Sequence, residues 1–225
     1  MDKKNIGFYE TIQRAISEYM KGVYTAIPAH VVAFDPKTQM AQIELGVMRV
    51  DIDGVSSVPP PVIDVPVLFV GDGYVVETQI DVGCEGLALF SQRCIDGWLN
   101  IGGCAPNPLA RFHDMTDALF IPGFRPMPRV VSGFSNNGIK LRNAKGNQFA
   151  WLKNDGSISI ENGKGHIRLS SDGVVTINGV TISVDSIVTA QKVVGKQDVT
   201  FAGISGKSHV HGGVERGNST TNAPQ

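Results

Sequence analysis

Beyond residue 132 the sequence repeats a short unit in which apolar and polar residues alternate, as in GIKLR, SISIE, HIRLS, VVTIN and VTISV. Connectors such as NDG, SDG and NG separate the units. Alternation at a period of two predicts half-buried strands, and Asn-Gly or Asp-Gly pairs predict tight turns between them. Successive units open at steps of eight to ten residues, at Ile139, Phe149, Ile158, Ile167 and Val175. Such a period is typical of a β-solenoid or β-helix.

The composition of this segment limits how it can close. Of the twelve prolines, all but Pro224 lie at or before Pro128, so the repeats keep their backbone donors for a continuous sheet. Each strand offers only two or three apolar side chains, which is too little to enclose a core in one copy. Three copies around one axis would share a core, and we expect strand edges of each chain to pair with the next chain. A monomeric solenoid is the alternative.

The region before these repeats has a different pattern, with short β-rich runs separated by turn residues such as DPKTQ and GDG. The runs are AHVVAFD (29–35), MAQIELGVMRVDI (40–52), DVPVLFVG (64–71), YVVETQI (74–80) and CEGLALFSQ (84–92). Five short strands predict a small barrel, with the OB-fold as the leading candidate. The runs hold few aromatic residues and no basic cluster that would bind nucleic acid, so we interpret the barrel as a structural collar.

The N-terminal residues predict an amphipathic helix over residues 6–27. Its apolar stripe repeats at three- to four-residue steps, through Ile6, Ile12, Ile16, Tyr19, Val23 and Ile27. We favour a helix that covers the open end of the barrel, and a helix that docks on a partner is the alternative. The chain is thus predicted to be all-β, with a helical segment (1–27), an OB-fold collar (28–132), a triple-stranded β-helix shaft (133–208) and a tip (209–225).

His209 and His211, two of only five histidines, stand one residue apart at the start of that tip. In a strand both would point to one face, with Val210 on the other. One chain supplies two imidazoles, too few for a closed zinc site, whereas a trimer supplies six. Six imidazoles suit octahedral iron or nickel, and cellular availability favours iron. A tail without a metal is the alternative.

The glycines Gly212 and Gly213 follow the histidines directly and would allow positive φ and close approach of three chains. Elsewhere, three cysteines stand ten residues apart without a CxxC pair, at Cys84, Cys94 and Cys104. We interpret them as reduced, mostly buried thiols, and a three-cysteine metal site is the weaker alternative.

The net charge limits the partners that we expect, and the N-terminal sequence limits the cellular location. A formal net charge of −1 does not favour nucleic acid or an anionic membrane as a partner. No signal-peptide pattern opens the chain, and no apolar run approaches the roughly 20 residues of a membrane span. We therefore expect a protein kept in a cytoplasm or released by a route that needs no signal.

Enzymatic motifs are missing from the sequence. HExxH and GxSxG do not occur, and GISGKS fails as a phosphate loop because Phe201 stands where its first glycine should be. Carboxylate pairs that could serve a glycosidase, Asp81 with Glu85 and Asp51 with Asp53, are interpreted as solvated turn residues. We likewise expect structural roles for the remaining histidines and the tryptophans: His30, His113, His166, Trp98 and Trp151. The sequence predicts no enzyme.

The segment HVHGGVERGNSTTNAP resembles the tip motif of central spike proteins from contractile phage tails. GCEGLALFSQRCIDGWL and RFHDMTDALFIPGF are similar to segments of the OB-like domain of that family and of its exit toward the β-helix. The resemblance implies one iron ion per trimer, held by six histidines, and only His209 and His211 are carried over as its ligands. The tail after the tip motif matches in residue types but departs in spacing.

The resemblance also implies a function: a homotrimeric spike that pierces the host outer membrane during sheath contraction. A tail hub or baseplate protein would bind the N-terminal domain, and nucleic acid would not be a partner. The expected location is the tip of the tail baseplate in the virion, after synthesis in the host cytoplasm. Two alternatives remain, a trimeric β-helical receptor-binding adhesin and a cell-wall hydrolase component of the tail.

Overall fold

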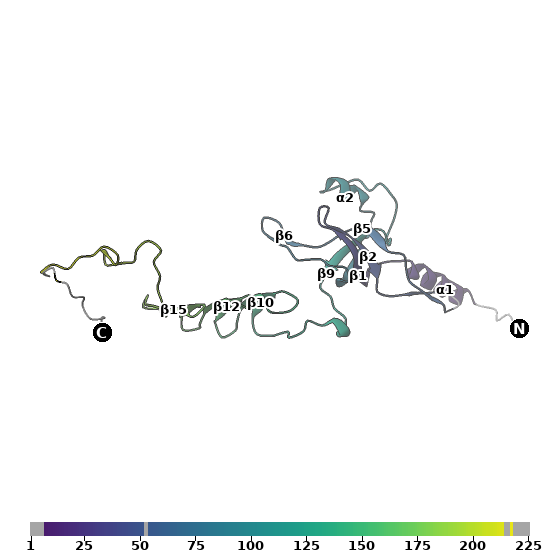
Figure 1. Ribbon diagram of the computed structural model, residues 1–225. Helices are drawn as coiled ribbons and strands as arrows, with labels where there is room; N and C mark the ends of the chain where they lie inside the picture. Colours follow the sequence, from purple (N-terminus) through teal and green to yellow (C-terminus); the bar gives the residue numbers. More distant parts are fainter. Residues whose placement is uncertain (1–6, 52–53, 214–216, 218–225) are drawn as a thin grey trace. The chain divides into compact units, whose positions relative to one another are not determined.

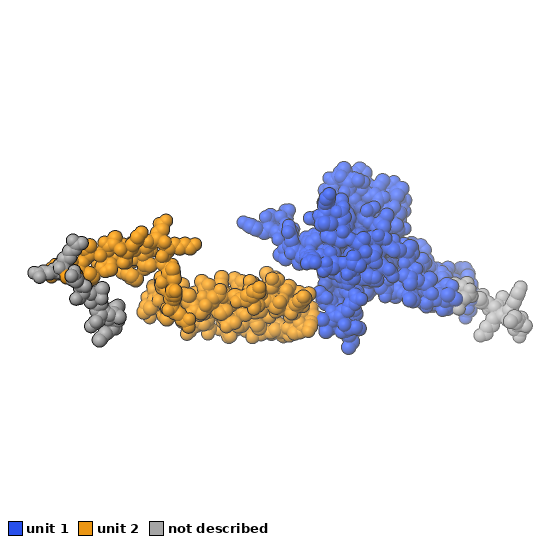
Figure 2. Space-filling model, viewed as in Figure 1, with its two compact units in different colours: residues 1–130 blue, residues 131–225 orange. Residues whose placement is uncertain are grey.

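The computed structural model describes residues 7–51, 54–213 and 217, and most of its regular structure is β-strand (Figure 1). The chain forms two compact units, residues 1–130 and residues 131–225 (Figure 2). The larger sheets are antiparallel in both units. The prediction of an all-β chain with an N-terminal helix is therefore confirmed.

The first unit is built on a five-stranded sheet in the order β5-β2-β1-β8-β9. Its strands are β1 (Ala26–Asp35), β2 (Met40–Leu45), β5 (Val62–Pro66), β8 (Glu85–Phe90) and β9 (Ala118–Pro122). The sheet closes on itself because Val67, just after β5, forms a parallel bridge with Phe120 in β9. The Leu68 amide also donates to the Phe120 carbonyl at 2.9 Å. Numbered along the chain, the strands run 1-2-3-5-4-1 around the barrel, which is the order of an OB-fold.

The core of the barrel follows from alternation along its strands. Every second residue of β2 and of β8 is buried, since successive side chains point to opposite faces. The largest side chains exposed by less than 2 % belong to Phe120, Ile43, Val31, Val65 and Asp117. Each fully buried aliphatic or aromatic side chain contributes roughly 1.5–3 kcal/mol, so this unit has a stable core of its own.

Two of the predicted barrel strands are wrong. Residues 74–80 do not join the barrel, and only β7 (Val75–Val76) pairs there, with β6 (Val70–Gly71) in a small hairpin. The predicted run 40–52 splits within its described part, residues 40–51, because β3 (Arg49–Val50) leaves the barrel to pair with β4 (Ser56–Ser57). The missing barrel strand is β9, whose Ala118 and Phe120 point into the core. Residues 75–76 bury no side chain, so they gain nothing from a place in the barrel.

Helix α1 (Phe8–Lys21) ends earlier than the predicted helix over residues 6–27, of which Ile6 lies outside the described residues. Gly22 caps its C-terminus, and the chain is already extended in β1 from Ala26. None of the residues of α1 is buried, so the expected role as a cover for the barrel is not observed. In the described part of the chain, no helix combines the length and the hydropathy needed to cross a bilayer.

Two short helical segments follow in the first unit, α2 (Asp96–Ile101) and the 3₁₀ helix η1 (Met127–Arg129). Arg129 holds η1 against the barrel, because its guanidinium forms an ion pair with Glu85 at 2.9 Å. The same guanidinium donates to the Gly83 carbonyl at 3.1 Å. The segment that leaves the barrel is therefore attached to β8 by a side chain.

The second unit begins with a ladder of seven antiparallel strands in chain order (Figure 1). They are β10 (Ile139–Arg142), β11 (Phe149–Leu152), β12 (Ile158–Glu161), β13 (His166–Leu169), β14 (Val175–Ile177), β15 (Val180–Ile182) and β16 (Val188–Thr189). Each strand pairs with the next strand of the same chain. This differs from the expectation that strand edges would pair with a neighbouring chain. Short turns reverse the chain after every strand, so the nearest partner is always local.

The register of the ladder sorts its side chains into two faces. The apolar face consists of two rows that cross the strands: Ile139, Leu152, Ile158, Leu169, Val175, Ile182 and Val188, then Leu141, Ala150, Ile160, Ile167, Ile177 and Val180. The polar face holds two aromatic side chains among mostly polar ones: Lys140, Arg142, Phe149, Trp151, Ser159, Glu161, His166, Arg168, Thr176, Thr181 and Thr189. No side chain of the apolar face is buried, and most are exposed.

The two edges of the ladder have different turns. On one edge the connectors all have the same length, residues 153–157, 170–174 and 183–187. Each closes with the same hydrogen bond, from the amide of its first residue to the carbonyl of its last. On the other edge the connectors shorten along the chain, from residues 143–148 through 162–165 to 178–179. The strands shorten as well, so the ladder narrows toward the C-terminus.

Candidate metal centre

The tip begins with a hairpin of two very short strands, β17 (Thr200–Phe201) and β18 (Ile204–Ser205). Ala202 and Gly203 form its turn, with φ values of 45° and 83°. Positive φ at both central residues is the pattern of a type I′ turn, whose twist matches paired strands. The hairpin therefore returns the chain to Ser205, four residues before the first histidine of the pair.

The carboxylate of Asp198 connects the two sides of this hairpin. Its Oδ1 accepts the amide of Val199 at 2.8 Å and the amide of Lys207 at 2.9 Å. A hydrogen bond from the Ser205 side chain, with those backbone amides, holds the pKa of Asp198 below its usual range. The ionised carboxylate thus fixes the entry and the exit of the hairpin.

The histidine pair is brought together in the structure. The ring centroids of His209 and His211 lie 5.0 Å apart, and the ring planes meet at 80°. The residues are not in a strand, contrary to the expectation, because the chain turns after β18 instead of continuing as a ladder. Gly213 adopts the expected positive φ, 78°, whereas Gly212 does not. The rest of the predicted tip, residues 214–225 except Gly217, lies outside the described residues.

The donor set of this pair fits a transition metal that accepts imidazole. The Nδ1 of His209 lies 2.9 Å from the Ser205 carbonyl oxygen, which can only accept, so Nδ1 carries the proton. The Nε2 of His209 is then free to coordinate. Two imidazoles from one chain leave most positions of a four- or six-coordinate ion unfilled, so a complete site needs donors from other chains.

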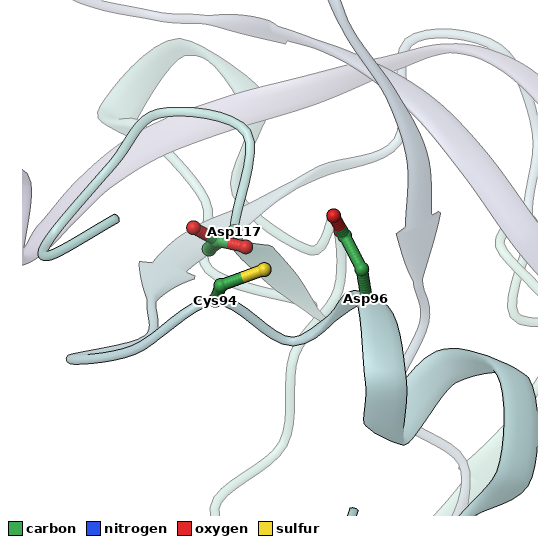
Figure 3. Close-up of side chains that lie close together, drawn as sticks. All are labelled: Cys94, Asp96 and Asp117. Carbon is green, nitrogen blue, oxygen red and sulfur yellow. The ribbon is translucent and has the colours of Figure 1, made fainter. Parts of the chain in front are cut away.

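A second group of metal-capable side chains lies beside the barrel, at Cys94, Asp96 and Asp117 (Figure 3). Their potential ligand atoms lie within 4.8 Å of one another. The group already has a cation, the guanidinium of Arg111. Its Nη2 donates to Asp117 at 2.8 Å, to Asp96 at 2.9 Å and to the Cys94 sulfur at 3.2 Å.

These contacts identify the group as a partly buried ion-pair network rather than a metal site. The hydrogen bond to the fully buried Asp117 raises the pKa of Arg111 above its already high value. Asp117 also accepts the Ile95 amide at 3.0 Å, which anchors the loop before α2 to the barrel. A metal would have to displace a guanidinium that satisfies both carboxylates.

The three cysteines are free and do not come together. Cys94 is buried, Cys84 is intermediate and Cys104 is exposed, so only one of the three matches the expectation of burial. Desolvation is the main cause that raises the pKa of the Cys84 thiol. In the described part of the chain, the weaker alternative of a three-cysteine site is therefore not formed.

The other candidate residues have structural partners. Glu85 is ion-paired with Arg129, Asp81 accepts from Gln79 at 2.8 Å, and Asp51 accepts the Val55 amide at 2.8 Å. Asp53 lies outside the described residues. Of the single histidines, His113 contacts the Tyr24 carbonyl through Nδ1 at 3.0 Å.

His30 lies in β1, and His166 begins β13, where its amide donates to the Asn178 side chain at 2.8 Å. The indole of Trp151 donates to the Asn137 carbonyl at 2.6 Å, and the ammonium of Lys140 lies 4.2 Å from the centre of its ring. Trp98 lies in α2 and is partly exposed. The side chains of His113 and Trp151 therefore have structural partners in the fold.

Two known families match the chain, one over the barrel and one over the tip. Residues 27–123 match the family described as phage protein Gp138 N-terminal domain. Residues 203–225, which include the histidine pair, match the family described as GpV apex motif. No curated protein matches the chain at a significant level. The two matches lie on the barrel and on the tip, in the order of the chain, and together they indicate a phage baseplate spike protein of the Gp138 and GpV kind.

Proposed function

We propose that three copies of the chain form the central spike of a contractile phage tail, and that this spike pierces the host outer membrane when the sheath contracts. The observation that carries the proposal is the exposed apolar face of the ladder. Its two rows of aliphatic side chains form a contiguous patch without cover in a single chain. A patch of this kind marks an interface.

Three ladders around one axis would cover this face. Cyclic symmetry lets the same surface of each chain meet its copies and leaves none of it exposed. The polar face would then form the outside, with the ion pair of Arg168 and Glu161, 2.9 Å apart, in water. Since the backbone is already paired within each chain, side-chain packing would supply most of the contact between chains.

At the tip, His209 and His211 of each chain would together supply six imidazoles to one iron ion. The 5.0 Å separation of the two rings and the free Nε2 of His209 support this assignment. The ion would supply a cross-link between three chain ends. Because separate chains hold no complete site, its binding free energy would add directly to the stability of the assembled tip.

The remaining roles follow from this arrangement. The OB-fold barrel would attach the spike to a tail hub or baseplate protein, and the spike would reach the virion after synthesis in the host cytoplasm. The role would be mechanical, without catalysis. A trimeric adhesin is the rival function, and the uniformly short turns of the ladder offer little surface for a specific receptor.

Light scattering and elemental analysis of the same untagged, full-length sample test the proposal. We expect the mass of a trimer and about one iron per three chains, a ratio that no monomeric site gives. The double variant His209→Ala, His211→Ala should stay trimeric and lose the iron. A monomer in solution would overturn the assembly, and a whole metal ion per chain would overturn the shared site.

Glycan-array binding and a peptidoglycan zymogram address the two alternatives on the same sample. A spike should give background signal in both measurements. Specific binding to a glycan would favour an adhesin, and cleared peptidoglycan would favour a hydrolase.

A further inference from the structure

We propose that Asp198 and Ser205 are positioning residues for the tip, and that they hold His209 in the tautomer that coordinates metal through Nε2. The inference rests on the proposed function, because it concerns the same histidine pair. It adds which nitrogen of His209 binds, and which residues outside the histidine motif select it.

The first step is the carbonyl of Ser205, which accepts two hydrogen bonds from one residue. The backbone amide of His209 lies 3.1 Å from it, and Nδ1 of the same residue lies 2.9 Å from it. A carbonyl oxygen has no proton to give, so the second contact requires a proton on Nδ1. A neutral imidazole with Nδ1–H has its lone pair on Nε2, and a fixed partner on the other nitrogen orients the ring.

The second step is what holds that carbonyl in place. Ser205 pairs with Thr200 across the hairpin, so its backbone direction is set by β17. Its hydroxyl accepts the Ser208 amide at 3.0 Å and lies 2.8 Å from the Ser208 hydroxyl. These contacts close the turn that leads from β18 to His209.

The third step is Asp198, which ties this turn to the strand on the other side of the hairpin. Its carboxylate accepts the amides of Val199 and Lys207, and the Gly206 amide donates to the Val199 carbonyl at 2.7 Å. A Cβ on Gly206 would lie 2.9 Å from that carbonyl oxygen, so the turn is closely packed against residue 199. Loss of the carboxylate would free the exit of the hairpin two residues before His209.

A comparison within the unit shows that Asp198 differs from the other turn carboxylates. Asp155 accepts from Ser157, two residues away, at 2.8 Å from its amide and 2.7 Å from its hydroxyl. Asp198, in contrast, reaches Lys207 across the hairpin. Asp155→Ala is therefore a matched control that removes a turn carboxylate without touching the tip.

The experiment follows iron release from the full-length trimer into excess chelator. Asp198→Ala should stay trimeric and release iron at least about 10-fold faster than the wild type, the lower end of the effect of losing a partner that orients a ligand. Asp155→Ala should release iron at the wild-type rate. Equal rates for the two variants would overturn the role of Asp198.

A second measurement needs no variant. In metal-free, full-length protein with ¹⁵N-labelled histidine, the His209 signals should show a protonated Nδ1 and an unprotonated Nε2. The reverse tautomer would overturn the inference even if Asp198→Ala failed to assemble. Wild-type protein that holds no shared iron would instead contradict the proposed tip, which separates failure of the function from failure of the inference.

Discussion

The barrel and the ladder both pair their strands within the chain, but only the barrel buries apolar side chains. Phe120, Ile43 and Val31 are almost fully enclosed in the barrel. In the second unit, Ser159 is the one buried residue among those described, and it is polar. In this molecule, the pairing of strands therefore does not by itself produce a buried core.

Because of this difference, the stability of the two units should depend differently on protein concentration. The barrel closes through the bridge between Val67 and Phe120, so its stability should not depend on protein concentration. The ladder leaves its apolar face to be covered by other molecules. If copies of the chain cover it, the stability of the ladder depends on association and hence on concentration.

The largest effect is expected from a substitution on the apolar face of β14, which should prevent assembly. Ile177 and Thr176 are neighbours in β14 and point to opposite faces. Ile177→Asp should abolish the proposed trimer at micromolar concentration, because burial of an unpaired carboxylate costs several kcal/mol in each chain. Thr176→Asp, opposite Arg168 on the polar face, should leave the mass unchanged. Light scattering measures both, and a trimeric Ile177→Asp variant would contradict the packing of the apolar face.

A smaller effect is expected from the barrel core. Phe120→Ala removes a large side chain that is 1 % exposed, and it should lower the free energy of unfolding of the barrel by about 3–5 kcal/mol. Thermal unfolding at several protein concentrations checks this prediction. The loss of unfolding free energy should be the same at each concentration. A loss that shrinks as concentration rises would show that the barrel, too, depends on association.

The smallest effect concerns pH. Side-chain or backbone hydrogen bonds lower the pKa of Asp155, Asp172 and Asp198 in the second unit, and of Asp114 in the barrel. A lowered folded-state pKa stabilises the fold above the unfolded value near 4, and that stability is lost as pH falls through the folded value.

Melting curves between pH 7 and pH 3 should therefore show a modest decrease confined to the acid end. We expect the turns of the ladder to lose more stability than the barrel. The variant Asp155→Asn should show a smaller decrease in melting temperature, because it lacks the contribution of this carboxylate. An equal decrease in the variant and the wild type would show that this carboxylate does not contribute.

Periodicity made much of the fold predictable. Alternation located the strands of the ladder, and Asn-Gly and Asp-Gly pairs located many of its turns, because both signals are local. Long-range pairing was not predictable in the same way. Residues 118–122 entered the barrel instead of residues 74–80, since membership depends on which segment can bury Ala118 and Phe120.

The tip was predictable as a pair of histidines but not as a geometry. The motif predicted that His209 and His211 act together, and the structure brings their rings within 5.0 Å. The orientation of His209 depends on two residues that lie before the His-x-His segment, Ser205 and Asp198. Their contribution depends on a hairpin that no spacing rule specifies. A carboxylate directly before a short hairpin is the weak signal that could have pointed to Asp198.

The turns of equal length along one edge make the reach of the spike an adjustable quantity. Removal of residues 153–169 would join Leu152 to Val175 through residues 170–174, a connector of the same length and closing hydrogen bond as residues 153–157. Both rows of the apolar face would stay continuous, and the chain would still leave in the same direction. Loss of a single strand would reverse that direction. Insertions and deletions can therefore lengthen or shorten the ladder by whole hairpins and leave the barrel and the tip unchanged.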